Sequence, residues 1–390
     1  MARGAGLKKG NTTRKIASMM AHPDTQQTTD GTDATTMRAM VMEKPRQMRL
    51  TCVPKPEPKP HEALVRIESV GVCGSDVHYY RDGAIGLQQV TAPLVLGHEY
   101  AGVVEAAGTA AGPALVGRRV AVEPGIPCGR CEACRTGAYN VCTKMFFPGG
   151  PGCDGALCEY MAVDAAFCFP IPEDMPADVA AMIEPVAVAL HAVELAHLRP
   201  GETAAILGLG PIGLLTAQIA KMSGVRTLYG ADLLPYRAEA AATHGVDHAF
   251  LAGVPEDAPR DGRCHDRAVR AILQATDGRG VDVAFDCTNG SEGLKNTVHL
   301  ARGAGRCVLV GISGAEEDIL PVSVARRREL TLRWCRRFKH NYPAAIELVH
   351  MGKVKVRPLV THSFPLERAR EAYELVSANA DGVLKASIDF

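Results

Sequence analysis

The chain has 390 residues, of which 43 are basic and 43 acidic, so its formal charge at neutral pH is zero. This length predicts two domains, and the balanced charge argues against a nucleic-acid or membrane-surface partner, because such proteins usually carry a basic excess. Thirteen cysteines, with no apolar secretory segment in front of them, predict a reducing and therefore cytoplasmic compartment.

Residues 1–36 precede the first apolar pattern. They are polar, rich in Thr, Ala and Gly, and carry basic residues near their start. Such a composition buries too little apolar surface to fold, so we expect a disordered extension. Two alternatives are open: a basic transit peptide, and a start codon assigned too far upstream of Met37.

Residues 37–185 form the first expected domain. Short apolar segments such as 63–67 and 117–122 are separated by Gly and Pro, which is typical of an irregular, mostly β domain.

This domain contains a group of residues that suits a catalytic metal. Cys73 is followed by Ser75 and His78, and His98 and Glu99 come twenty residues after His78. A thiolate, an imidazole and a carboxylate can hold a zinc ion and leave its fourth position open for water or substrate. Taken singly, each residue also has an ordinary structural explanation, such as a buried cysteine or a surface glutamate.

Four further cysteines in the same domain follow the spacing C-x2-C-x2-C-x7-C, at Cys128, Cys131, Cys134 and Cys142. Closely spaced thiolates on a loop can surround one zinc ion in a closed tetrahedral site. An iron–sulfur cluster is the alternative, but the long last spacing and the absence of a Cys-Pro ending argue against it.

Residues 186–335 form the second expected domain, because apolar strands alternate there with segments of helical length. The expected strands are 204–207, 227–230, 281–286 and 306–310, and their spacing leaves room for crossover helices in a parallel sheet. The uncharged stretch 203–220 is long enough to span a membrane, but its clustered Gly and Pro favour a strand, a turn and a helix start. Residues 336–390 are too few for a core of their own, so we expect them to complete the first domain.

The first strand of the second domain leads into a glycine-rich turn, Gly208-Leu-Gly210-Pro211-Ile212-Gly213, which opens a helix. In this context the pattern is typical of a dinucleotide site in a doubly wound Rossmann sheet, where the helix N-terminus receives the pyrophosphate.

Two residues of the next strand-to-helix connection bear on which dinucleotide binds. Asp232 ends the second strand, 19 residues after Gly213. Its carboxylate can accept hydrogen bonds from ribose hydroxyls and repel a 2′-phosphate, so the sequence predicts NAD rather than NADP. Arg237 leaves this choice partly open, since an arginine can also contact a phosphate.

From Met37 onward the chain resembles the zinc-dependent medium-chain dehydrogenases, and most closely their sorbitol (polyol) dehydrogenase branch. The resemblance rests on motifs that occur in the family's order, namely Gly71–Tyr79, Gly97–Glu99, Val122–Gly125, Glu184 and Gly208–Gly213. It implies a GroES-like catalytic domain beside the Rossmann domain. One position departs from the polyol enzymes, which have tyrosine after the arginine, whereas this chain has Phe338 after Arg337.

The resemblance also implies roles for individual residues. A catalytic zinc is expected on Cys73, His98 and Glu99, and Glu184 is expected beside its water. Whether Glu99 or Glu184 is the third protein ligand is open. Substrate contacts are expected from Tyr79, Glu184 and Arg337. Cofactor contacts are expected from Ile212, Asp232, Arg237, Val310, Gly311 and Ile312.

The expected activity is oxidation of a secondary alcohol in a polyol to the ketone, through a zinc alkoxide and hydride transfer to NAD. Ser75 and His78 are expected to relay the released proton. Two zinc ions per chain and a homo-oligomer, either a tetramer or a dimer, are further expectations. The alternatives are a 2,3-butanediol, threonine or aldose dehydrogenase, and a non-enzymatic dinucleotide-binding protein.

Overall fold

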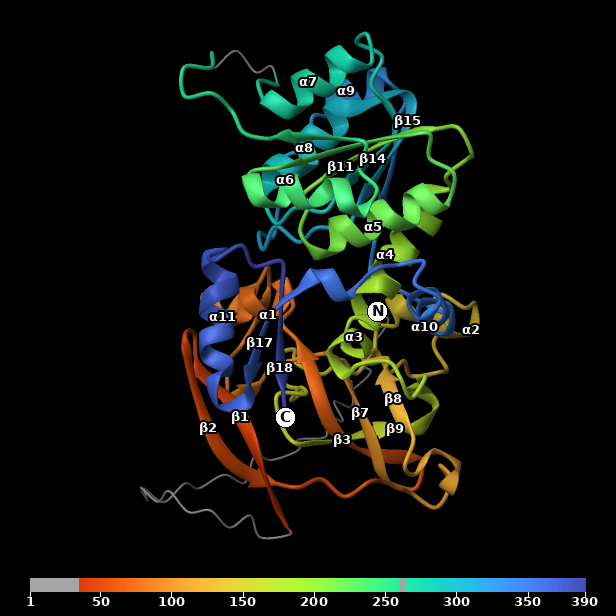
Figure 1. Cartoon of the computed structure of the whole chain (residues 1–390), viewed down its shortest axis with the longest axis vertical. Helices are drawn as coiled ribbons and strands as arrows, with labels where there is room; N and C mark the ends of the chain where they lie inside the picture. The colour runs from red at the N-terminus through yellow and green to blue at the C-terminus, as the bar shows by residue number, and fades with distance from the viewer. Residues whose placement is uncertain (1–34, 260–263) are drawn as a thin grey trace, which may run out of the picture.

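A computed structural model describes residues 35–259 and 264–390, and the predicted extension over residues 1–34 lies outside them. The first strand begins at Thr36, which pairs with Pro54. Figure 1 shows two bodies joined end to end, with a mostly β part below and an α/β part above.

The lower body contains two main sheets. A three-stranded sheet has the order β2-β1-β6, and a seven-stranded sheet has the order β10-β8-β7-β3-β18-β17, with β9 also paired to β3. Their strands are β1 (Thr36–Lys44), β2 (Gln47–Pro54), β3 (Glu62–Gly71), β6 (Leu94–Val95), β7 (Glu99–Ala107), β8 (Arg119–Val122), β9 (Tyr160–Asp164), β10 (Cys168–Pro170), β17 (Val360–Pro365) and β18 (Lys385–Asp389). A short hairpin joins β4 (Ala84–Ile85) to β5 (Gln88–Gln89).

The helices of the lower body include the last α-helices of the chain. They are α1 (Gly74–Asp82), α2 (Glu132–Arg135), α3 (Ala177–Ala181), α10 (Tyr342–His350) and α11 (Ala369–Ala378). Since β18 pairs with β3, the last strands of the chain belong to the same seven-stranded sheet as β3. A separate core, which includes Tyr80, Tyr100 and Tyr373, fills this body.

The upper body is a doubly wound α/β domain. All six strands run parallel in the order β13-β12-β11-β14-β15-β16, which is the order expected of a dinucleotide-binding fold. The strands are β11 (Thr203–Leu207), β12 (Thr227–Asp232), β13 (His248–Leu251), β14 (Val281–Asp286), β15 (Ala301–Leu309) and β16 (Thr331–Trp334). The helices are α4 (Ile183–Ala196), α5 (Pro211–Met222), α6 (Pro235–Ala241), α7 (Arg267–Ala275), α8 (Ser291–Leu300) and α9 (Val322–Arg327).

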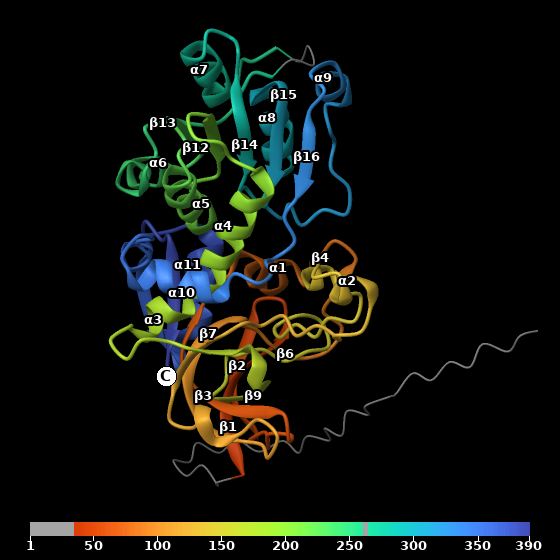
Figure 2. The same cartoon turned by 90° about the vertical axis from the view of Figure 1, so that its right-hand side faces the viewer.

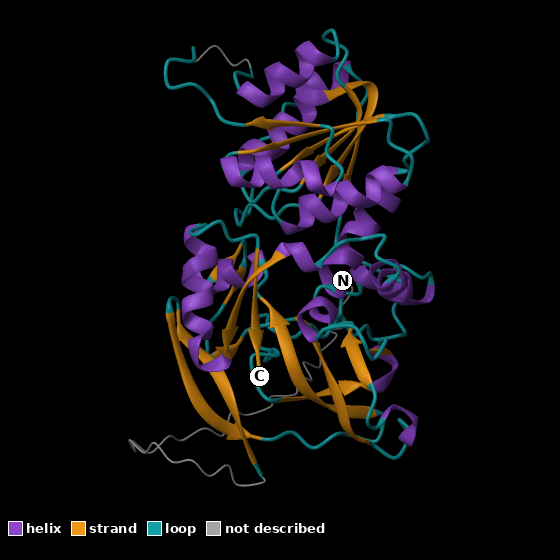
Figure 3. Ribbon diagram, in the orientation of Figure 1, coloured by secondary structure: helices purple, strands orange, loops and turns teal. Residues whose placement is uncertain are grey.

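Helices lie on both faces of this sheet, as Figure 3 shows, and the central strands β11, β12 and β14 are buried on both sides. This explains why the strands read as continuous apolar runs and not as alternating ones. The uncharged stretch 203–220 forms strand β11, the glycine turn and most of helix α5. The predicted α/β class and the mostly β partner domain are therefore confirmed.

Helix α4 joins the two bodies and lies between them in both views (Figures 1 and 2). The stretch Ala177–Ala196, which ends in α4, is long and apolar enough to cross a membrane by length and composition, but 78% of its apolar window is buried inside the protein. It is therefore a core helix. Its apolar residues pack in one cluster with residues of both bodies.

Candidate active site

Strand pairing brings the predicted metal ligands together. Strands β3 and β7 are antiparallel neighbours, and Gly71 lies opposite Glu99 in their register. Cys73 follows the end of β3 by two residues and begins α1, while His98 directly precedes β7. Ligand atoms of Cys73, His98 and Glu99 all lie within 4.8 Å of one another.

Two buried residues, Asp76 and Lys385, contact the side chains of these predicted ligands. Asp76 Oδ1 lies 3.0 Å from His98 Nδ1, which leaves the other imidazole nitrogen to face a metal. Lys385 Nζ donates to Glu99 Oε2 at 2.6 Å, which leaves the second carboxylate oxygen of Glu99 available. Sequence reasoning missed both residues, although Asp76 belongs to the same motif as Cys73.

The balance of charge at this site suits a divalent cation. Asp76, Glu99 and Glu184 are all buried, with 0%, 1% and 4% of their surface exposed, and Cys73 adds a thiol. Lys385 is a buried cation beside them. Buried carboxylates are costly unless they are paired or bind metal, so the donor set fits a zinc ion.

The predicted proton-relay residues lie on helix α1. Ser75 Oγ donates to Cys73 Sγ at 3.3 Å, and His78 Nδ1 lies 3.4 Å from Asp82 Oδ2. A Cβ placed on Gly314 of the upper body would lie 3.0 Å from the His78 ring, so this loop covers the histidine. Among the residues that the structure describes, Ser75 and His78 share no hydrogen bond, so a relay between them requires a water or a bound hydroxyl group.

Three predicted substrate contacts interact electrostatically around the metal ligands. Burial raises the pKa of Glu184 to about 7, Glu99 adds to this effect, and His98 and Arg337 oppose it. Burial lowers the pKa of Arg337 to about 10, while Glu184 and Tyr79 act in the opposite direction. The Tyr79 hydroxyl donates to Gln88 Oε1 at 3.2 Å.

An aromatic ring that the sequence did not single out joins this group. The Arg337 guanidinium carbon lies 3.5 Å from the centre of the Phe147 ring, and the same ring lies 5.0 Å from the His98 ring. Phe338 points elsewhere, since it is 3% exposed and its ring lies 5.4 Å from that of Tyr342 in the core. Phenylalanine in place of tyrosine at position 338 therefore puts an apolar side chain in an apolar environment.

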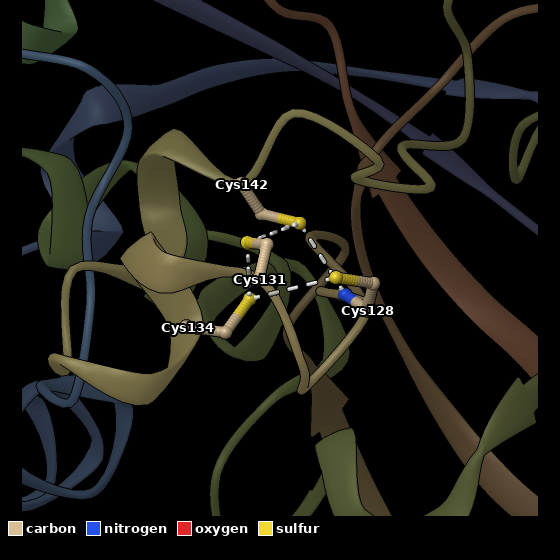
Figure 4. Close-up of side chains that lie close together, drawn as sticks. All are labelled: Cys128, Cys131, Cys134 and Cys142. Carbon is tan, nitrogen blue, oxygen red and sulfur yellow. Dashed lines mark hydrogen bonds between the residues drawn. The ribbon is translucent and has the colours of Figure 1, made fainter.

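The four cysteines of the second predicted site converge. Their sulfurs face one another in Figure 4, with separations of 3.3 Å (Cys131 to Cys134), 3.8 Å (Cys131 to Cys142) and 3.9 Å (Cys128 to Cys134). Four thiolates at about 2.3 Å from a tetrahedral zinc would be about 3.8 Å apart. The backbone N–H groups of Cys128 and Lys144 donate to Cys142 Sγ, which fixes the position of this sulfur.

The glycine turn has the backbone geometry that a dinucleotide site requires. Gly208 has φ +86°, and a Cβ there would lie 2.6 Å from the Cys287 carbonyl oxygen. A Cβ on Gly213 would lie 1.9 Å from the Gly208 carbonyl oxygen, so only glycine lets helix α5 approach β11 this closely. Gly210 caps α5, and Pro211 and Ile212 begin it, so free N–H groups lie at this end.

Asp232 ends β12 beside this turn. Its carboxylate accepts hydrogen bonds from the N–H groups of Leu209 and Leu234, at 2.7 and 2.9 Å. Arg237 Nη1 lies 3.9 Å from Asp232, and Arg237 Nη2 donates to Asn379 Oδ1 of the lower body. This arginine is thus partly occupied by contacts within the protein.

The segment after β15 passes close to the end of β14. The N–H groups of Val310 and Gly311 both donate to the Asp286 carbonyl oxygen, at 2.8 and 2.9 Å. A Cβ on Gly311 would lie 1.7 Å from the Thr288 carbonyl oxygen, and Ile312 is 42% exposed.

Comparison with known families gives two matches. Residues 59–173 match the alcohol dehydrogenase GroES-like domain, and residues 211–351 match the zinc-binding dehydrogenase domain. The sorbitol dehydrogenase of Bacillus subtilis is 37% identical over 338 residues, which are 87% of this chain and 93% of that protein. The probable D-xylulose reductase A of Aspergillus terreus is 36% identical over 342 residues, 87% of this chain and 95% of that protein.

Solved structures agree with these matches. The E. coli L-idonate 5-dehydrogenase has a TM-score of 0.79 at 27% identity, over 91% of this chain and 98% of that one. The Bacillus subtilis 2R,3R-butanediol dehydrogenase has a TM-score of 0.77 at 29% identity, over 91% and 99%. An E. coli alcohol dehydrogenase, rspB, solved with NADH, has a TM-score of 0.81 at 30% identity, over 92% and 100%.

Fold and site together define a two-domain dehydrogenase with a metal centre beneath a dinucleotide-binding domain. The chain belongs to the zinc-binding alcohol dehydrogenase family, in agreement with the resemblance to the polyol branch.

Proposed function

We propose that this enzyme oxidises a secondary alcohol group of a polyol to a ketone, with NAD as the hydride acceptor. The observation that carries the proposal is the group of Cys73, His98 and Glu99, whose ligand atoms lie within 4.8 Å of one another. Glu184 and Arg337 interact electrostatically beside this group.

Different residues of the chain have different roles in the proposed reaction. Cys73, His98 and Glu99 would hold a zinc ion, which supplies Lewis acidity to a hydroxyl oxygen and lowers the pKa of that hydroxyl. Ser75 and His78 would carry away the O–H proton of the substrate, and a bound NAD would supply the acceptor for the hydride of the hydroxyl-bearing carbon. Glu99 fits the third ligand position better than Glu184, because Glu184 is not a member of the close three-residue group among the described residues.

The substrate class follows from the polar groups around the metal ligands. Arg337 and Glu184 offer donors and acceptors that a simple apolar alcohol would leave unpaired, whereas a polyol can satisfy them. The Tyr79 hydroxyl, which donates to Gln88, can still accept a hydrogen bond from such a substrate. The relatives named sorbitol dehydrogenase and D-xylulose reductase support this choice. For the cofactor, the Asp232 carboxylate supports NAD, because it would repel a 2′-phosphate.

A diol is the second candidate, since a structural neighbour is a 2R,3R-butanediol dehydrogenase. The test is a panel of polyols, 2,3-butanediol, threonine and aldoses, assayed for NADH and NADPH formation together with zinc analysis. We expect the highest kcat/KM for a polyol with NAD, and two zinc ions per chain. A preference for butanediol or threonine would refute the polyol proposal, and faster reduction of NADP would refute the role of Asp232.

We further propose that residues 37–185 and 336–390 form the catalytic domain and residues 186–335 the NAD-binding domain. The entry of β17 and β18 into the sheet of β3 supports this division. A cytoplasmic location is consistent with the thirteen cysteines, all within the described residues and none in a disulfide.

We also propose that the protein forms a homo-oligomer through its NAD-binding domain. Strand β16 is an edge of the six-stranded sheet, and exposed apolar side chains lie on it and in the segment that precedes it, namely Trp334 (66% exposed), Val322 (62%) and Ile319 (72%). An apolar sheet edge of this kind is suited to pairing with a second copy.

A further inference from the structure

The segment that carries Arg337 connects the two bodies of the molecule. It leaves the sheet edge at β16 and enters helix α10, and it contains two non-glycine residues with left-handed backbone, Arg337 (φ +52°) and His340 (φ +56°). Since this conformation is unfavourable for residues with a side chain, the surrounding structure must hold it in place.

The contacts that hold it come from the four-cysteine loop. The Tyr139 hydroxyl accepts a hydrogen bond from the His340 N–H at 2.8 Å, and Asn140 Nδ2 donates to the Arg336 carbonyl oxygen at 2.8 Å. His340 Nε2 also lies 3.0 Å from the Gly137 carbonyl oxygen, and the rings of Tyr139 and His340 meet edge to face at 4.6 Å. Arg337 is thus flanked on both sides by residues that this loop fixes.

Tyr139 is itself anchored. Its hydroxyl donates to Glu123 Oε1 at 2.7 Å, and Glu123, 3% exposed, directly follows β8. One hydroxyl therefore bonds the buried end of a sheet strand and the backbone of the connecting segment at the same time. Asn140 is also buried, with 8% of its surface exposed.

The guanidinium of Arg337 depends on this arrangement. Within residues 35–259 and 264–390, it forms no hydrogen bond or ion pair, and its close neighbour is the ring of Phe147 at 3.5 Å. Phe147 follows the last cysteine of the loop by five residues. Because no side chain ties the guanidinium directly, its position depends on the backbone at residues 336–340 and on this ring.

We propose that Tyr139 and Asn140 are positioning residues for the substrate, which act by holding Arg337 against Phe147, next to His98. The inference rests on the proposed function, because it takes Arg337 as a substrate contact. On this proposal the four-cysteine loop has a second role besides binding metal, since it fixes the residue that recognises the hydroxyl groups of the polyol.

The test is a double-mutant cycle in the full-length, zinc-loaded enzyme, with the polyol that has the highest kcat/KM in the panel. Tyr139→Phe should raise KM by roughly two- to tenfold, the effect of losing one hydrogen bond, with a smaller change in kcat. Asn140→Ala should do the same. The dissociation constant for NADH and the content of two zinc ions per chain should not change.

Coupling to Arg337 separates this role from general destabilisation. Tyr139→Phe should have no further effect on KM when Arg337→Ala is already present, because the interaction it supports is gone. The matched control is Tyr160→Phe, which removes a tyrosine hydroxyl beside Lys55 and Glu105 in the same domain and should leave KM unchanged.

Two results would overturn the inference while leaving the proposed function intact. One is an unchanged KM in both Tyr139→Phe and Asn140→Ala when Arg337→Ala raises it. The other is full additivity of Tyr139→Phe with Arg337→Ala. If Arg337→Ala does not raise KM for any polyol, the proposed substrate contact itself is wrong.

Discussion

Cys73 is the residue whose replacement separates metal binding from cofactor binding. Cys73 occupies the N-cap position of helix α1 in the lower body, whereas the glycine turn lies in the upper one. A serine hydroxyl is a poor zinc ligand at neutral pH, so Cys73→Ser should lower kcat by more than about a hundredfold. Zinc content should fall from two ions to one per chain, and NADH should bind as before. Retained turnover would contradict the assignment, and Cys52→Ser, at an exposed thiol, is the control.

Asp286 ends β14 with 7% of its surface exposed, and burial raises its pKa to about 6 although Thr288 donates to it twice. A carboxyl whose pKa is raised by folding favours the folded state at low pH, and this contribution is lost as pH rises through the folded-state pKa.

Asp286→Asn removes the charge and keeps an oxygen that can accept from Thr288. It should therefore stabilise the protein by about 1 to 3 kcal/mol at pH 8 and by less at pH 5. Urea unfolding at both pH values measures this, with Asp174→Asn at an exposed carboxyl as the control. A gain that does not depend on pH would show that ionisation of Asp286 is not the cause.

Individual residues were predictable from sequence where chemistry requires one residue type at a fixed spacing. The glycines of the cofactor turn and the cysteines of both metal groups are of this kind. Lys385 was not predictable, because it lies 286 residues from Glu99 and meets it only where β18 joins β3. Phe147 has no motif of its own, and it becomes recognisable only when the Arg337 guanidinium lies over its ring.

At the scale of elements, the four-cysteine loop has little regular structure of its own. It contains the four-residue helix α2, and none of the residues of that helix is buried. The loop is closed at its base by the bridge between Ile126 and Phe146, and within it the sulfurs and the contacts of Tyr139 and Asn140 replace a buried core.

Cys131→Ser should for this reason lower the unfolding free energy by about 4 kcal/mol or more and remove one zinc ion per chain. Denaturant unfolding and metal analysis measure the two effects together. An unchanged zinc content would mean that these thiols do not form a metal site.

Four strands of the parallel sheet followed from sequence, because strands buried on both faces appear as short apolar runs between turns. The edge strands β13 and β16 are largely exposed and were not predicted. The strand predicted at 281–286 agrees with β14, and the helix predicted to begin at the glycine turn agrees with α5. The small elements of the lower body, such as the pairs β4–β5 and β1–β6, gave no such pattern. They are two residues long or depend on partners distant in sequence.

At the scale of the whole molecule, the predicted catalytic residues all come from one chain. Helix α4 carries Glu184 at its start and packs against both bodies, and the connection from β16 to α10 carries Arg337 back from the upper body. The loop at Gly314 of the upper body lies against His78 of the lower body. The Gly314 carbonyl oxygen accepts a hydrogen bond from the N–H of Gly86. The site is thus assembled between the two bodies of a single protomer.

If the proposed oligomer forms along β16, it should therefore be separable from catalysis. Trp334→Glu places a charge on the exposed edge strand and should disfavour pairing there. We expect the variant to elute as a single chain of 41.4 kDa in size exclusion with light scattering, whereas the wild type elutes at a multiple of that mass. Met351→Glu is the control, because Met351 is similarly exposed, at 57%, but lies at the end of α10. Turnover per chain should persist in the Trp334→Glu monomer, and an unchanged mass would place the interface elsewhere.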